Sequence, residues 1–105
     1  GVCNLKRDIG GITDIEFMAQ YVVLAWAKFQ PMLLIFPDNI RIFETCESGG
    51  LLPRKTADTL CRTYRLFRKE RHHLMLLGKK GLVPSRRHAL IRAEIKKIWD
   101  ELLVF

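Results

Sequence analysis

Long hydrophobic runs are absent from this 105-residue sequence. The longest purely apolar stretches, Tyr21–Ala27 and Met32–Phe36, fall well short of the roughly 20 residues that a membrane-spanning helix needs. The amino-terminal segment carries Lys6 and Asp8 and shows no apolar core of a secretory signal. We therefore expect a cytoplasmic protein that has no membrane partner.

Cysteine is also scarce. Cys3, Cys46 and Cys61 are an odd number without the spacing of a metal site, and the motifs C-x-x-C and H-E-x-x-H do not occur. The adjacent His72 and His73 diverge on a helix, so they do not form an i, i+4 metal pair. We expect reduced thiols, no metal site and, since no nucleophile–base arrangement is evident, no catalytic residue in this chain.

Acidic residues are outnumbered, with 11 Asp and Glu against 18 Lys and Arg and a net charge of +7. The basic residues are spread over 54–71, 79–80 and 86–97 and do not form a tail, which favours solvated helix faces. A basic chain also permits nucleic-acid binding, but a helix-turn-helix signature and a clustered basic stripe are missing. We expect no nucleic-acid partner.

Hydrophobic periodicity predicts an all-α fold: an antiparallel helical bundle of about four main helices with an N-terminal loop, forming one domain over residues 1–105. The expected helices span residues 13–28, 39–47, 53–77 and 86–103. Asp38 is expected to cap the second helix and Ser85 the fourth, and Gly49-Gly50 to end the second. No strand pair with a hairpin turn is evident.

The first helix is expected to begin with a T-x-x-E capping box formed by Thr13 and Glu16. Its apolar run, residues 21–27, predicts that it is the most buried helix of the bundle. The side chains expected to be shielded are Tyr21, Leu24 and Trp26.

The segment Lys6–Phe17 joins a cation, the glycine pair Gly10-Gly11 and the acidic residues Asp14 and Glu16. Glycine allows another group to approach the backbone closely, and a helix start favours anions. One interpretation is a phosphate site, although the Walker pattern is absent; the other is a capped helix start. As a surface loop, it is expected to tolerate Gly11→Val within a few degrees of melting temperature.

Arg68 and His72 lie one turn apart on the third helix and can reach the same partner. A hydrogen-bond network to another helix or to the glycine pair is one interpretation. An anion contact is the other, because Arg matches phosphate and carboxylate geometry. Asn39 and Arg41 can likewise cap their helix, pair locally or dock onto the glycine segment.

Four motifs resemble, in order and spacing, the glutamine-synthetase adenylyltransferase family. They are K-x-x-x-G-G-I-x-D-I-E-F-x-x-Q-Y from Lys6 to Tyr21, D-N-x-R at residues 38–41, Y-x-x-[L/F]-R-x-x-x-H-x-L from Tyr64 to Leu74, and W-x-x-L at residues 99–102. The sequence departs from the family at Phe67, where Leu is usual, and at Arg71, where a hydrophobic residue is usual.

Family members are bifunctional bacterial enzymes with two nucleotidyltransferase domains, each followed by a helical bundle. One half transfers AMP from ATP to a tyrosine of glutamine synthetase, and the other removes it. The resemblance implies that this chain is the bundle after the adenylylating domain, a C-terminal fragment of an enzyme of nitrogen-assimilation control. It implies Mg²⁺ and ATP for the full-length enzyme, but neither cofactor nor activity for the fragment, which lacks the family's catalytic G-S and acidic residues.

The candidates for contacts with the nucleotide cleft or the domain interface are Lys6, Gly10, Gly11, Asp14, Glu16, Asn39, Arg41, Arg68 and His72. The expected partners are the upstream nucleotidyltransferase domain of the same chain, glutamine synthetase and the nitrogen signal regulatory protein. The alternative interpretation is a structural or regulatory docking module for glutamine synthetase or the signal protein, without nucleotide contact.

Overall fold

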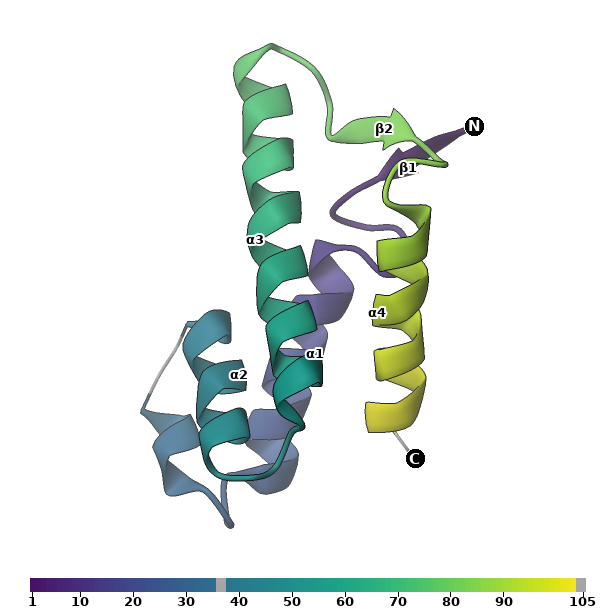
Figure 1. Cartoon of the computed structure of the whole chain (residues 1–105). Helices are drawn as coiled ribbons and strands as arrows, with labels where there is room; N and C mark the ends of the chain where they lie inside the picture. Colours follow the sequence, from purple (N-terminus) through teal and green to yellow (C-terminus); the bar gives the residue numbers. More distant parts are fainter. Residues whose placement is uncertain (36–37, 104–105) are drawn as a thin grey trace.

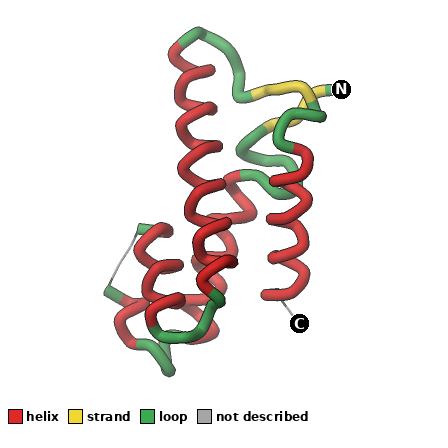
Figure 2. The backbone as a smooth tube through the Cα atoms, viewed as in Figure 1, coloured by secondary structure: helices red, strands yellow, loops and turns green. Residues whose placement is uncertain are grey.

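Helices make up most of the chain, for which the computed structural model describes residues 1–35 and 38–103 (Figure 1). In chain order the elements are β1 (Val2–Asn4), α1 (Ile12–Trp26), the 3₁₀ helix η1 (Pro31–Leu34), α2 (Asn39–Ser48), α3 (Arg54–Leu76), β2 (Leu82–Pro84) and α4 (Ala89–Leu102). Helix α3 runs in the opposite direction to α1 and α4 (Figure 1). The predicted all-α bundle is confirmed, with one small sheet added at one end (Figure 2).

Short-range signals set the limits of α2 and α3. Asp38 caps α2, because its carboxylate accepts a backbone N–H two residues further on at 2.9 Å. Gly50, at φ +77°, ends α2 and donates its N–H to the Glu47 carbonyl at 3.0 Å. Gly78, at φ +73°, makes the same bond to Met75 after α3. The predicted limits of both helices are confirmed to within one residue.

Helix α1 begins differently from the prediction. Gly11 is its N-cap, so Thr13 lies inside the first turn, exposed, and no side chain provides the cap. Asp14 Oδ2 instead accepts the backbone N–H of Gly10 at 2.8 Å. Glu16 points to α3 and not back to the helix start. The predicted capping box is therefore wrong, because the helix starts at Ile12, one residue before Thr13. The Asp14 carboxylate accepts a backbone N–H from the turn that precedes the helix.

The core lies where the apolar stripes of the four helices meet. Helix α3 contributes the apolar stripe Leu60, Tyr64 and Phe67, and α4 contributes Ile95 and Ile98. The largest fully buried side chains are Leu5, Ile15, Met18, Val22, Leu33, Phe43, Leu60, Phe67 and Ile95. Each helix therefore contributes to one continuous core.

The carboxyl-terminal half of α1 is less covered than predicted. Leu24 is 87% exposed, while Tyr21 and Trp26 are half-buried. The prediction that Leu24 is shielded is wrong, because the core takes only one stripe of this helix, which ends at Val22. An apolar run on all sides does not specify which side the other helices cover.

The small sheet was not predicted. β1 pairs with β2 in antiparallel register, with Cys3 opposite Val83. The Leu5 N–H extends the pairing by donating to the Gly81 carbonyl at 3.1 Å. The sequence shows no strand pair with a hairpin turn, and these two strands have none, because about 80 residues separate them in the chain.

Helix α4 begins at Ala89, three residues later than predicted. Ser85 does not cap it; the Ser85 N–H donates to the Gly1 carbonyl at 3.0 Å beside the sheet. His88 takes the N-cap position in the left-handed region, at φ 58°. Over the parts of the chain that are described, no helix combines the length and the apolar character needed to cross a bilayer.

Candidate functional site

Four of the predicted site residues line one cavity between the amino-terminal segment, α1 and α3. They are Lys6, Glu16, Arg68 and His72, and the cavity has a volume of about 320 Å³. Its other lining residues are Ile12, Tyr64, Arg71 and Met75. We call it the cationic cavity, because the cations Lys6, Arg68 and Arg71 line it together with a single carboxylate, that of Glu16.

The hydroxyl of Tyr64 joins three helices at this cavity. It donates to Glu16 Oε2 at 3.3 Å and accepts from Asn39 Nδ2 at 3.1 Å and Arg68 Nη1 at 3.5 Å. The Arg68 guanidinium also lies over the Tyr64 ring, 5.4 Å from its centroid. Three predicted site residues, on α1, α2 and α3, therefore share one buried hydroxyl.

Lys6 is held in place through its backbone. Its N–H donates to Asn4 Oδ1 at 2.9 Å, and its carbonyl accepts the N–H of Thr13 at 2.9 Å. Because both backbone groups are fixed, the exposed side chain of Lys6 starts from a defined point on the rim of the cationic cavity.

Gly10 and Gly11 are buried, and the predicted open surface loop is wrong. A Cβ on Gly10 would lie 2.4 Å from the Arg92 carbonyl oxygen of α4, and Gly10 has φ +79°. A Cβ on Gly11 would lie 2.5 Å from the Leu5 carbonyl oxygen. The close approach that these glycines permit is made by this chain's own backbone. Their contact with another domain stays a prediction.

Asp14 and Arg41, like the glycine pair, lie outside the lining of the cavity. Asp14 bonds to the Gly10 N–H and so stabilises the turn before α1. Arg41 is exposed on α2. The structure thus groups Lys6, Glu16, Arg68 and His72 on the cavity wall, with Asn39 one hydrogen bond behind them, and separates the other four candidates from it.

Sequence reasoning missed Tyr64 and Arg71 as part of this site. Tyr64 belongs to the apolar stripe of α3, since it is only 5% exposed, and its position in that stripe conceals its role in the site. Arg71 interrupts that stripe, and this interruption was the available signal. Its Cγ would lie 3.3 Å from a Cβ at Gly81, so the missing side chain there leaves room for the stem of Arg71.

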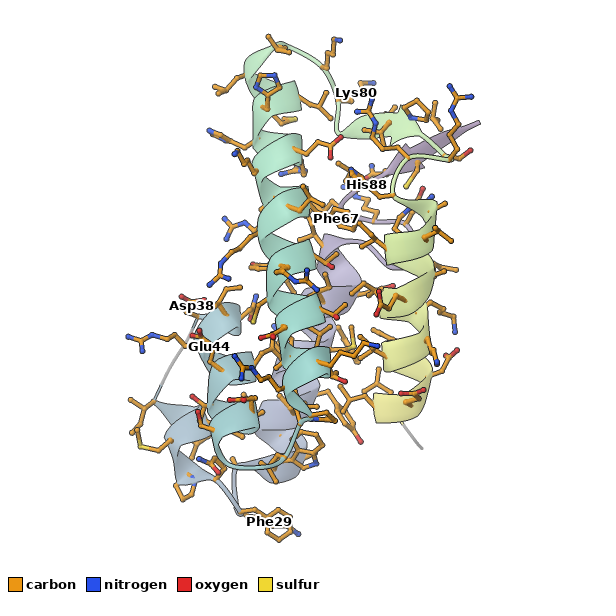
Figure 3. All side chains as sticks on the ribbon, viewed as in Figure 1. Phe29, Asp38, Glu44, Phe67, Lys80 and His88 are labelled. Carbon is orange, nitrogen blue, oxygen red and sulfur yellow. The ribbon has the colours of Figure 1, made fainter. Side chains whose placement is uncertain are left out.

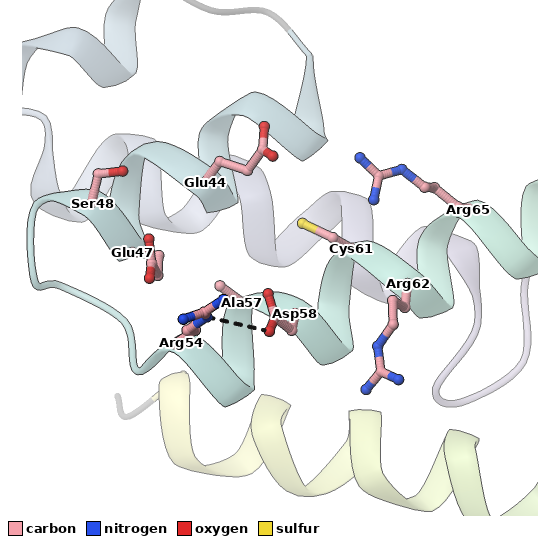
Figure 4. Close-up of a pocket in the computed structure, with 9 residues that line it drawn as sticks. All are labelled: Glu44, Glu47, Ser48, Arg54, Ala57, Asp58, Cys61, Arg62 and Arg65. Atoms are coloured by element: carbon pink, nitrogen blue, oxygen red, sulfur yellow. Dashed lines mark ion pairs between the residues drawn. The ribbon is translucent and has the colours of Figure 1, made fainter.

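A larger cavity of about 690 Å³ lies between α2 and α3 (Figure 4). Its charged lining residues are Glu44, Glu47, Asp58, Arg54, Arg62 and Arg65, three of each sign. Arg54 Nε and Asp58 Oδ2 are 3.9 Å apart. Burial raises the pKa of the Cys61 thiol to about 11, so it stays protonated near neutral pH and is a poor nucleophile. The balanced charge favours no ion.

A cluster of three charged or polar side chains, Glu70, Arg87 and His88, joins α3 to the start of α4. Arg87 Nη1 donates to Glu70 Oε1 at 2.9 Å, and His88 Nε2 lies 2.6 Å from Glu70 Oε2. The His88 ring also packs on Phe67, with centroids 5.4 Å apart (Figure 3). His88 is therefore half-buried and closes the junction between two helices.

The fold and these contacts define a small helical domain with one cationic cavity. Within residues 1–35 and 38–103, no three His, Cys, Asp or Glu side chains are placed to hold a metal ion. The chain belongs to the family described as GlnD PII-uridylyltransferase, whose sequence model matches residues 2–84.

The chain is also similar to bifunctional glutamine synthetase adenylyltransferase/adenylyl-removing enzymes. Identity is 41% over 99 residues with that of Pseudomonas putida, 44% over 99 residues with that of Pseudomonas aeruginosa, and 46% over 100 residues with that of Thioalkalivibrio sulfidiphilus. The matches cover 94 to 95% of this chain and 10% of each relative. The chain thus spans about a tenth of the length of these relatives, in their carboxyl-terminal region.

Proposed function

We propose that this chain is the helical domain that supports AMP transfer from ATP to a tyrosine of glutamine synthetase in a longer bacterial enzyme. In this proposal the preceding nucleotidyltransferase domain performs the chemistry, and the helical domain closes one side of the nucleotide cleft. The three cysteines are buried and free, which fits a reducing compartment such as the cytoplasm.

One observation carries the proposal. Lys6 and Glu16 come from the first motif, and Arg68 and His72 from another more than 40 residues later, yet all four line a single cavity. A purely structural role would not require cations from separate segments to converge on a solvent-filled space. Guanidinium and ammonium groups are well suited to phosphate.

The two kinds of comparison carry different names. The family description names a PII-uridylyltransferase, while the relatives are named as adenylyltransferases of glutamine synthetase. We favour AMP transfer, because the relatives match 94% of this chain at 41 to 44% identity. Glutamine synthetase and a nitrogen signal regulatory protein are the corresponding proposed partners.

The donors of the cationic cavity do not fit a magnesium site. Mg²⁺ prefers several oxygen ligands in octahedral geometry, and the one carboxylate here, that of Glu16, already accepts from Tyr64. The chain's own residues can position and neutralise an anion, and the carboxylates that bind Mg²⁺ are assigned in the proposal to the preceding domain.

A docking module without nucleotide contact is the second candidate. The observation in its favour is an apolar groove of about 550 Å³ formed by the end of α1, η1 and the start of α2. Leu24, Leu34 and Ile35 line it and are 87%, 70% and 62% exposed. An exposed apolar patch of this kind is typical of protein interfaces.

The deciding experiment uses the full-length enzyme with Lys6→Ala or Arg68→Gln. We expect kcat/KM for ATP in AMP transfer to fall at least tenfold in each variant. Arg65→Gln, which removes the same charge from the same helix outside the cavity, is the matched control. If ATP dependence is unchanged in both variants, nucleotide contact is refuted; if Leu24→Ser then weakens glutamine synthetase binding, the docking module takes its place.

A further inference from the structure

We infer that the cationic cavity is a preformed binding site for a phosphate chain, with two or more negative charges, and that Arg71 is its central ligand. The inference rests on the proposed function only for the assignment of the cavity to a nucleotidyltransferase. It goes further by naming the bound group and the residues that bind it, of which Arg71 was not among the predicted site residues.

The first argument is charge. Across the described residues, the cations Lys6, Arg68 and Arg71 make no ion pair with an acidic side chain. The only carboxylate on the cavity wall, Glu16, has one oxygen bonded to the Tyr64 hydroxyl. Several cations that face one space without a counterion repel one another, and an anion in that space removes the repulsion.

The second argument is preorganisation. Arg68 is oriented by both the ring and the hydroxyl of Tyr64, while two hydrogen bonds fix the backbone of Lys6, from which its exposed side chain extends. Arg71 is half-buried, and its stem lies against the bare backbone of Gly81. Side chains that are already placed lose less entropy when a ligand binds, which is the property of a built site.

The third argument is the kind of anion. Arg68 and Arg71 are three residues apart, so their guanidinium groups lie on neighbouring positions of α3. Two such forks and one ammonium match several tetrahedral oxygens better than a single planar carboxylate. The volume of about 320 Å³ equals that of about ten water molecules in the liquid, which is room for more than one phosphate group.

The source of the phosphate chain is either a free polyphosphate or a nucleotide, and the same titration distinguishes them. We would titrate the 105-residue chain in 0.15 M NaCl with inorganic tripolyphosphate, ATP and AMP by calorimetry. Tripolyphosphate is expected to bind with a dissociation constant below about 1 mM and AMP at least tenfold more weakly. ATP within threefold of tripolyphosphate would support recognition of the phosphate chain itself. Binding of ATP without binding of tripolyphosphate would overturn the assignment.

The variants separate this site from general attraction to a basic protein. Arg71→Gln is expected to weaken tripolyphosphate binding about tenfold, as expected for one lost charge-assisted contact. Arg68→Gln is a second variant with the same expectation, and circular dichroism checks the fold of each. Arg65→Gln, the matched control, is expected to change binding less than twofold, because salt screens distant surface charges.

Equal weakening by Arg71→Gln and Arg65→Gln would overturn the inference, and so would the absence of tripolyphosphate binding. The two proposals fail separately. Suppose that the chain binds tripolyphosphate through Arg71 but that Lys6→Ala and Arg68→Gln leave AMP transfer by the full-length enzyme unchanged. The proposed function is then refuted. If transfer depends on Lys6 and Arg68 but the chain binds no polyphosphate, only the present inference is refuted.

Discussion

The hydroxyl of Tyr64 donates to Glu16 Oε2 at 3.3 Å and so ties the middle of α3 to the second turn of α1. The same oxygen accepts from Asn39 on α2. One partly buried hydroxyl oxygen therefore links three helices beside the cationic cavity. It also keeps the only acidic side chain of that cavity in a defined place.

Tyr64→Phe removes this oxygen and keeps the ring. We expect the variant to lose about 1–3 kcal/mol of unfolding free energy, because Asn39 and Glu16 lose a hydrogen-bond partner at a partly buried position. Urea denaturation measures the loss. An unchanged midpoint would show that water replaces the hydroxyl without cost and that the hydroxyl does not hold the helices.

Gly11→Ala is expected to destabilise the chain by about 1–3 kcal/mol, as overpacking does. The new Cβ would lie 2.5 Å from the Leu5 carbonyl oxygen and 2.8 Å from that of Asp8. Both are backbone atoms in a hydrogen-bonded turn, so neither can rotate aside. Gly50→Ala is the comparison, since a Cβ there meets nothing within 4 Å and only its positive φ is strained. Thermal unfolding should rank Gly11→Ala as the more costly change.

Leu24→Ala is expected to leave the stability nearly unchanged, because this side chain is 87% exposed. Phe67→Ala, at a fully buried site that also supports the His88 ring, should cost about 3–5 kcal/mol. Chemical denaturation of both variants measures the difference. A large loss at Leu24 would mean that the apolar groove is covered in solution, for example by a second copy of the chain.

Acid should loosen the junction between α3 and α4. Burial acts to raise the pKa of Glu70, but the hydrogen bonds and charges of His88 and Arg87 together outweigh it and hold the pKa below its ordinary value of 4.5. A carboxylate with a lowered folded pKa contributes stability above its unfolded pKa and loses it as the pH falls through the folded pKa. We expect wild type to lose this contribution below about pH 4.5, and Glu70→Gln to lack it at every pH.

Unfolding midpoints measured between pH 3 and pH 7 test this expectation. Glu94→Gln removes an exposed carboxylate of α4 and serves as the control. If Glu70→Gln and Glu94→Gln show the same pH dependence, the Glu70 ion pairs contribute nothing measurable to stability.

The 105-residue chain by itself should transfer no AMP. It offers no cluster of carboxylates for Mg²⁺ among its described residues, and its buried Cys46 and Cys61 thiols have a pKa raised to about 11 by desolvation. The assay incubates the chain with ATP, Mg²⁺ and glutamine synthetase and follows labelled AMP. Transfer by a pure preparation, abolished by Arg71→Gln, would place the chemistry in this domain.

Local signals in the sequence were sufficient for much of the fold. Asp38 and Gly50 act through their own neighbours in the chain, so the limits of α2 could be predicted. Leu24 and the strand residue Cys3 depend instead on segments far away in sequence, and no local pattern shows which side of a helix is covered or which strand is paired.

In the candidate site, too, local sequence predicts some features, and the packing of distant segments determines the others. Spacing placed Arg68 and His72 on one face of a helix, but only the packing of α1 on α3 brings Glu16 and Lys6 to that face. Tyr64 was hidden in an apolar stripe, because a tyrosine can fill a core position and bond with its hydroxyl at once. The glycine pair suggested an external partner, although α4 itself occupies the space next to Gly10.

The pairing of Cys3 with Val83 sets an order of events during synthesis. The first strand leaves the ribosome about 80 residues before its partner, a wait of about 4–16 s at typical rates of about 5–20 residues per second. The backbone of Gly10 reaches its final contact even later, because it packs against the backbone of Arg92 in α4. The amino-terminal segment, which carries Lys6, therefore reaches its final position only when nearly the whole domain has been made.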